Sequence, residues 1–132
     1  MTRRLLTAMA IILLVVSVTG CGGSKTETNT KTQTTTADLK ASVKLTGGTT
    51  MEITNNDTFE WTSVKFEVNS QGLKSGYTYN LTSVKPGATV KAPLNQFTLG
   101  NGTRFNPVTT KPLNFSIWCK TATGNGWWYG AW

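Results

Sequence analysis

The sequence predicts an all-β domain of seven to nine short antiparallel strands packed as a two-sheet sandwich, and three observations support this prediction. From Leu39 onward, apolar and polar residues alternate with a period of two, which is typical of a strand with one buried face. Residues that favour turns interrupt this alternation at intervals of about ten residues. Beyond the N-terminal apolar segment, no stretch repeats its apolar residues with a helical period.

Each predicted strand is a short segment in which apolar side chains occupy alternate positions. In chain order, these strands are expected over residues 39–45, 51–53, 59–68, 77–81, 88–94, 97–99, 113–119 and 127–132. A domain of this size can bury roughly 60–65% of the surface of its unfolded chain. The domain is therefore expected to fold without a disulfide, because aromatic side chains at thirteen positions can fill its core.

The longest predicted strand carries an irregularity. Phe59 and Trp61 share one parity along this strand, whereas the apolar residues from Val64 onward share the other. Because side chains alternate strictly between the two faces of a strand, such a change of frame needs one extra residue. We therefore predict a β-bulge near Thr62-Ser63.

Residues that favour turns divide the second half of the domain into short strands. Lys85-Pro86-Gly87-Ala88 predicts a turn, with proline preset for its second position and glycine free to take a positive φ at the third. Pro93 cannot donate to a strand ladder, so its strand is expected at a sheet edge. Gly100-Asn101-Gly102 is a hairpin signal, and the segment from Thr121 to Gly126 is expected to turn the chain into its last strand.

The N-terminal segment resembles the precursors of bacterial lipoproteins. Arg3 and Arg4 precede an apolar run from Leu5 to Val18, which is short for a membrane span and fits the apolar region of a signal peptide. Val18-Thr19-Gly20-Cys21 is similar to the lipobox of that family. The resemblance implies a signal peptide over residues 1–20, cleavage after Gly20, and a diacylglycerol with palmitate-type acyl chains on Cys21. The alternative is an uncleaved short N-terminal anchor.

The anchor implies an extracytoplasmic protein held on the cell membrane or the outer membrane, because two or more acyl chains retain a protein durably on a bilayer. After Cys21, residues 22–38 contain a single apolar side chain, that of Ala37. Such a segment cannot bury enough surface to order itself, so residues 21–38 are expected to form a disordered, threonine-rich tether. A glycosylated stalk is the alternative. The folded domain is then expected over residues 39–132.

The succession Ile53-Thr54-Asn55, Trp61, Val64 and Phe66, followed by Val84-Lys85-Pro86-Gly87-Ala88, is similar to the immunoglobulin-like modules of secreted bacterial lipoproteins. This resemblance covers about 92 residues and implies an Ig-like sandwich. The Cys…Trp…Cys spacing of true immunoglobulin domains is absent from the sequence.

The residue types present leave little room for catalysis. The chain has no histidine and two cysteines, which excludes histidine-dependent catalysis and cysteine-rich zinc sites. Cys119 is in phase with the apolar residues of its strand, so its thiol is expected in the core. Glu60 and Glu67 are expected on a solvated sheet face, and Asn55-Asn56-Asp57 is expected to form an Asx-type turn. We therefore predict no enzymatic activity, no cofactor and no metal.

The C-terminal aromatic residues are the best candidates for a binding surface. Trp127 and Tyr129 lie on one face of the last predicted strand, whereas Trp128 and Trp132 lie on the other, and Trp118 opposes the apolar face of its own strand. Both sets cannot enter one core, so part of this group is expected to be exposed for contact with a ligand or partner. A barrel-like closure that covers both faces is the alternative.

Two functions remain open from the sequence. The first is a lipid-anchored binding module whose ligand is an envelope glycan or protein, and the second is a structural envelope protein or a subunit of a membrane-associated complex. The formal net charge is +7, and the basic residues are spread along the chain, which favours adhesion to anionic polymers or phospholipid. Nucleic acid is not an expected partner, because the chain carries an export signal.

Overall fold

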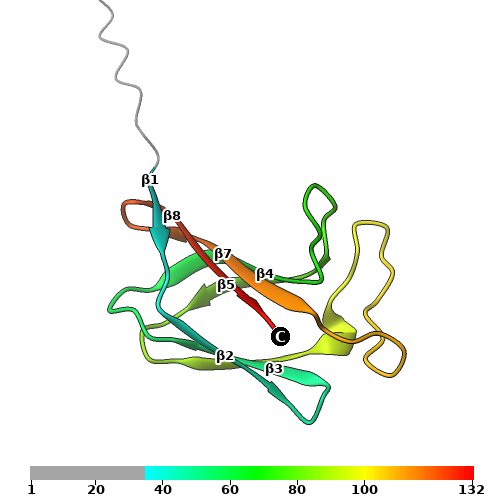
Figure 1. The fold of residues 1–132 in the computed structure, drawn as a ribbon. Helices are drawn as coiled ribbons and strands as arrows, with labels where there is room; N and C mark the ends of the chain where they lie inside the picture. Colours follow the sequence, from blue (N-terminus) through cyan, green and yellow to red (C-terminus); the bar gives the residue numbers. More distant parts are fainter. Residues whose placement is uncertain (1–34) are drawn as a thin grey trace, which may run out of the picture. The chain divides into compact units, whose positions relative to one another are not determined.

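The structure is a computed structural model that describes residues 35–132. It contains two β-sheets, which Figure 1 shows as separate layers. The predictions of a signal peptide, of lipidation at Cys21 and of a tether up to residue 34 lie outside the described residues. In chain order, the elements are β1 (Thr35–Asp38), β2 (Ala41–Thr46), β3 (Thr50–Asn55), β4 (Trp61–Val68), β5 (Tyr77–Val84), β6 (Thr89–Pro93), the 3-10 helix η1 (Leu94–Gln96), β7 (Asn114–Thr121) and β8 (Gly124–Ala131).

The strand order confirms the predicted all-β sandwich. One sheet has the order β1-β8-β7-β4-β5, and the other has the order β2-β3-β6. The hairpins β4-β5 and β7-β8 stay within the larger sheet, whereas the chain changes sheet after β1, β3, β5 and β6. Consecutive strands are thus distributed over two layers, as in a β-sandwich. Pro93 ends β6, which lies at a sheet edge as predicted.

The first strand corrects the predicted boundary between tether and domain. Thr35–Asp38 pairs in parallel with β8, so the expectation of disorder through residue 38 is wrong for these four residues. Their side chains are too polar to predict a strand, but the edge of β8 offers unpaired backbone groups to any extended segment. The next residue, Leu39, completes the docking, because its N–H donates to the Trp127 carbonyl at 2.9 Å and its side chain is buried.

The bulge predicted in the longest strand is confirmed. The pairing of β4 with β7 shifts register between Thr62 and Lys65, and Ser63 has a φ of 48°. The extra residue lets Trp61 on one side of the bulge and Val64 on the other point into the same core. Both side chains are fully buried, and they pack with the aromatic side chains Phe66, Phe97, Phe105 and Phe115.

A buried polar cluster ties the two sheets together at one end of the sandwich. Asn55, at the end of β3, donates through its side-chain amide to the carbonyls of Phe59 and Val84, each at 3.0 Å. Its side-chain oxygen accepts the Asp57 N–H at 2.9 Å, which is the Asx-type turn that the sequence predicts. Asp57 in turn accepts the indole N–H of Trp61 at 2.9 Å. The cluster thereby joins β3 to β4 and β5 and satisfies the only polar atom of the buried indole.

We expect Asp57→Ala to destabilise the fold by about 1–3 kcal/mol, because it leaves the buried indole N–H of Trp61 without an acceptor. Asp57 also accepts the backbone N–H of Lys40, which adds to the loss. Urea unfolding followed by tryptophan fluorescence measures this change. The control is Glu60→Ala, which removes an exposed carboxylate and is expected to leave the free energy of unfolding within about 0.5 kcal/mol of its original value. Equal stability of the two variants would contradict the role assigned to Asp57.

Candidate functional site

The outer face of the five-stranded sheet carries an ordered row of side chains. Strand pairing aligns five residues directly across the sheet, one from each strand. Residues opposite one another on neighbouring strands point to the same face and lie close together. From β1 to β5 the row contains Asp38, Trp127, Trp118, Lys65 and Asn80.

A second row runs beside the first, two residues further along the strands. It places Tyr129 opposite Ser116, and Ser116 opposite Glu67. The aromatic members of both rows are exposed, with relative accessibilities of 42% for Trp118, 36% for Trp127 and 49% for Tyr129. Three rings from two adjacent strands therefore form one surface, which we call the aromatic face.

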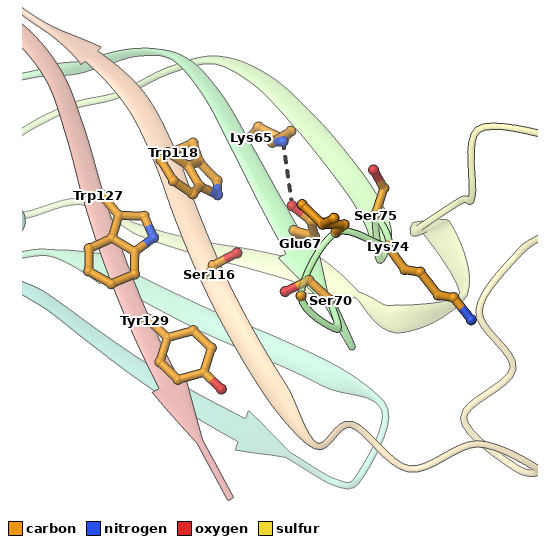
Figure 2. Close-up of a pocket in the computed structure, with 11 residues that line it drawn as sticks. Lys65, Glu67, Ser70, Lys74, Ser75, Ser116, Trp118, Trp127 and Tyr129 are labelled. Carbon is orange, nitrogen blue, oxygen red and sulfur yellow. Dashed lines mark ion pairs between the residues drawn. The ribbon is translucent and has the colours of Figure 1, made fainter. Parts of the chain in front are cut away.

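The rings of the aromatic face are arranged as a platform. Trp127 and Tyr129 are nearly parallel, with an interplanar angle of 17° and ring centroids 6.3 Å apart. Figure 2 shows these two rings side by side along β8, with their flat faces turned in the same direction. Trp118 is tilted by 44° to Trp127, with centroids 5.9 Å apart. Flat, exposed rings in this arrangement suit a ligand with its own flat apolar surface.

A shallow depression of about 290 Å³ lies between the aromatic face and the loop that joins β4 to β5. The loop folds back on itself, with the backbones of Gln71 and Lys74 paired to each other. At its start, Asn69 accepts the N–H of Leu113 at 2.6 Å, and the Asn114 side chain donates to the Ser70 carbonyl at 3.0 Å. The loop is thus fixed against the start of β7 and forms a wall of the depression.

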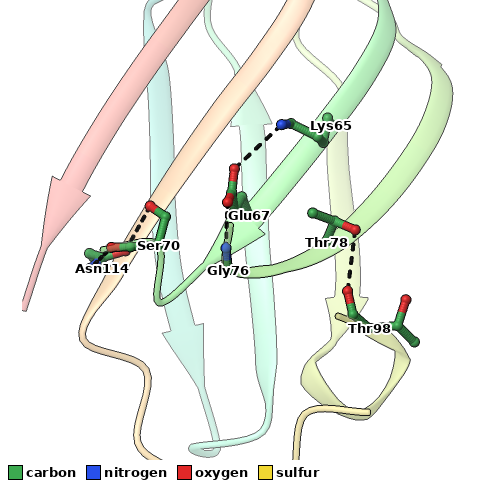
Figure 3. A network of polar contacts seen from close by, with 7 residues as sticks. All are labelled: Lys65, Glu67, Ser70, Gly76, Thr78, Thr98 and Asn114. Atoms are coloured by element: carbon green, nitrogen blue, oxygen red, sulfur yellow. Dashed lines mark hydrogen bonds and ion pairs between the residues drawn. The ribbon is translucent and has the colours of Figure 1, made fainter. Parts of the chain in front are cut away.

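Glu67 fixes the other end of this loop. Its carboxylate accepts the backbone N–H of Gly76 at 2.6 Å and forms an ion pair with Lys65 at 3.4 Å, as Figure 3 shows. A side chain on Gly76 would collide with the Val68 carbonyl, so glycine is needed for this close approach. The expectation that Glu67 is solvated is wrong, because only 6% of it is exposed. The loop covers it, which strand parity alone does not predict. Glu60, by contrast, is exposed as expected.

Lys65 lies at the centre of the site. Its ammonium nitrogen is 3.4 Å from the Glu67 carboxylate and 5.9 Å from the centroid of the Trp118 ring. The cation is therefore held between a carboxylate and the negative face of an indole. The depression thus combines a fixed positive charge with exposed rings and with the hydroxyls of Ser70, Ser75 and Ser116.

Two of the five aromatic residues predicted for a binding surface do not belong to the aromatic face. Trp128 points to the opposite side of β8, where it packs over Gly130 and meets Phe115 edge-on at a centroid distance of 6.4 Å. The structure does not place Trp128 on the aromatic face, because this ring is partly buried against the core. Trp132 is exposed at 55%, but it borders a separate depression with Leu45.

Cys119 is buried in the core, as predicted. Burial raises the pKa of its thiol to about 11; the nearby charge of Asp57 adds to the rise, and a hydrogen bond with the backbone of Gly126 opposes it. A side chain on Gly126 would collide with Leu39 and crowd the sulfur atom, so this glycine allows the close packing. A thiol in this environment is protonated at neutral pH and is a poor nucleophile.

Within residues 35–132, no group of three histidine, cysteine, aspartate or glutamate side chains could hold a metal ion. In the same residues, no helix has the length and apolar character needed to cross a bilayer. Comparisons with protein-family models, with curated proteins and with solved structures found no match for this chain.

The sequence predicts the aromatic members of the site but misses its polar members. Lys65 and Glu67 reach the aromatic face because β4 pairs with β7 in the observed register, whereas Ser116 lies two residues from Trp118 on β7 itself. The bulge near Thr62 is the available signal, since it reverses the parity of every residue that follows it in β4. Combined with the pairing of β4 and β7, it would have placed Lys65 beside Trp118.

The buried thiol predicts slow chemical modification. In a Cys21→Ser version of the chain, Cys119 is the sole thiol. We expect iodoacetamide at pH 8 to modify it at least about tenfold more slowly in the native state than in urea. Because the native pKa is raised, the stability gained by burying the neutral thiol is present below pH 9 and is lost as the pH rises toward 11. Equal rates in the two states would contradict the burial of Cys119.

Proposed function

We propose that this chain is a lipid-anchored, extracytoplasmic binding module and that its aromatic face binds a glycan. The anchor is the lipid on Cys21, and the ligand-binding surface is formed by Trp118, Trp127 and Tyr129. The proposal depends on one observation, the platform of three exposed rings from neighbouring strands beside a depression with a polar lining.

The chemistry of a sugar matches this surface. One face of a pyranose ring presents C–H groups that can stack on an aromatic ring, and its edge presents hydroxyls that need hydrogen-bond partners. The parallel rings of Trp127 and Tyr129 supply two adjacent stacking surfaces. Ser70 and Ser75 line the depression from the loop and supply hydroxyls, whereas Ser116 is buried. Binding sites of this kind combine apolar contact area with a few convergent polar groups.

A second function, as a subunit of an envelope complex, is supported by a different feature. Leu73, at the tip of the loop beside the depression, is fully exposed at 105%, and Val108 is exposed at 90%. Exposed aliphatic side chains are typical contacts for another protein when they form part of a larger apolar patch. We favour the glycan, because the three rings and the hydroxyls are contiguous, whereas Leu73 is a single side chain.

We expect Trp127→Ala and Tyr129→Ala each to weaken glycan binding by about tenfold, because each variant removes one stacking surface. The measurement is affinity electrophoresis and fluorescence titration of the full chain, purified in detergent, against a panel of neutral and acidic polysaccharides. The matched control is Trp132→Ala, which removes a more exposed indole outside the aromatic face.

The control variant is expected to bind as the unmodified chain does. An equal loss in the Trp132→Ala variant, or the absence of binding to every polysaccharide, would contradict the proposal. Co-purification with a stoichiometric protein partner that is lost in Leu73→Ser would support the complex subunit instead.

The anchor is tested by Cys21→Ala. We expect this variant to accumulate as an unprocessed precursor without lipid, since the resemblance to lipoproteins makes that thiol the attachment point. Labelling with a palmitate analogue, followed by membrane fractionation, measures the result. Cys119→Ala is the control and should be labelled normally, because its thiol is buried. A processed and membrane-bound Cys21→Ala protein would contradict the anchor.

A further inference from the structure

We infer that the depression beside Trp118 selects a pyranose glycan that carries an anionic substituent, a carboxylate or a phosphate, and that Lys65 binds this anion. The inference rests on the proposed function, because the same aromatic face stacks on the sugar rings. It adds the charge of the ligand and the place where that charge is bound.

The position of Lys65 is the first argument. Its ammonium group has three N–H donors, but Glu67 is its one ion-pair partner among residues 35–132. The remaining donors are available to the depression that Lys65 lines, and 43% of the side chain is exposed. Because Glu67 and the Trp118 ring already hold the ammonium in place, little further ordering is needed when an anion binds.

The local charge balance is the second argument. Glu67 is the one acidic residue that lines the depression, and it is buried with its two oxygens engaged by Gly76 and Lys65. Lys74 also lines the depression from the loop, and no ion pair forms with it in the part of the chain that the structure describes. The lining thus has two cations and one neutralised carboxylate, which leaves a net positive charge facing the ligand.

The arrangement of charge along the first row is the third argument, because it gives the ligand a direction. Asp38 lies at the β1 end of the row, beyond Trp127, whereas Lys65 lies beyond Trp118 toward β5. A glycan stacked on the two indoles therefore meets a carboxylate at one end and a cation at the other. Its anionic substituent is placed next to Lys65, away from Asp38.

The test uses the full chain in detergent with two pairs of polymers, and the members of each pair share one backbone and differ in the anionic group. Polygalacturonate and its fully methyl-esterified form test a carboxylate. A phosphorylated mannan and its dephosphorylated form test a phosphate. We expect the charged member of at least one pair to bind about tenfold more tightly than its neutral partner at low salt. The difference should shrink as salt is added.

Lysine variants locate the anion on the protein. Lys65→Met should abolish the preference for the charged polymer, whereas Lys65→Arg should retain most of it. Lys74→Met, on the exposed loop, should reduce the preference by roughly threefold without affecting the fold. The control is Lys44→Met, which removes an exposed lysine from the smaller sheet.

The outcomes separate this inference from the proposed function. Equal binding to the charged and neutral polymers, lost in Trp127→Ala, would overturn the inference and leave the glycan-binding proposal intact. Loss of the charge preference in Lys44→Met to the same degree as in Lys65→Met would also overturn the inference. Binding to vesicles of anionic phospholipid with no binding to any polymer would overturn both.

Discussion

The bulge in β4 is the constraint on which both the core and the candidate site depend. On its near side Trp61 points inward and is anchored by Asp57, and on its far side Val64 points inward again. A regular strand with Trp61 inside would also turn Lys65 and Glu67 toward the core, where two charges would lose their hydration. The extra residue, Ser63 with its φ of 48°, prevents this. The free-energy cost of the left-handed conformation of Ser63 is therefore offset by the filled core and by the hydration that Lys65 retains.

The sequence predicts those features of the fold that depend on local alternation, and it fails where pairing decides the outcome. Most strands, the bulge near Thr62 and the inward thiol of Cys119 follow from parity within one segment. The strand expected over residues 97–99 is not formed, and Thr98 makes isolated bridges with Thr78 and Arg104 instead. The pairing of Thr35–Asp38 with β8 does not, because its side chains carry no apolar signal and the contact is made by backbone groups. The prediction that Glu67 is solvated fails for a similar reason. Its strand parity is outward, but a loop that begins after the strand folds back over its carboxylate.

For the C-terminal aromatic residues, strand parity predicts only part of the candidate site. Alternation correctly separates Trp127 and Tyr129 from Trp128, but it does not state which set is exposed. That choice is made by packing. Gly130 leaves a space on the inner side of β8, and the ring of Trp128 fills it against Phe115. With the inner face closed in this way, the other set has no core to enter and remains at the surface.

Because the candidate site is built on paired strands, its side chains are largely ordered before a ligand binds. Association loses free energy when side chains and loops must be ordered, by about 0.5–1.5 kcal/mol for each flexible side chain that is immobilised. On the aromatic face, the rings stand on two hydrogen-bonded strands, and both ends of the neighbouring loop are held, by Asn69 and by Glu67. The cation is fixed by the same carboxylate that fixes the loop. A ligand at the proposed site would therefore meet a surface that is already formed, and little of its binding free energy would be lost in ordering the protein.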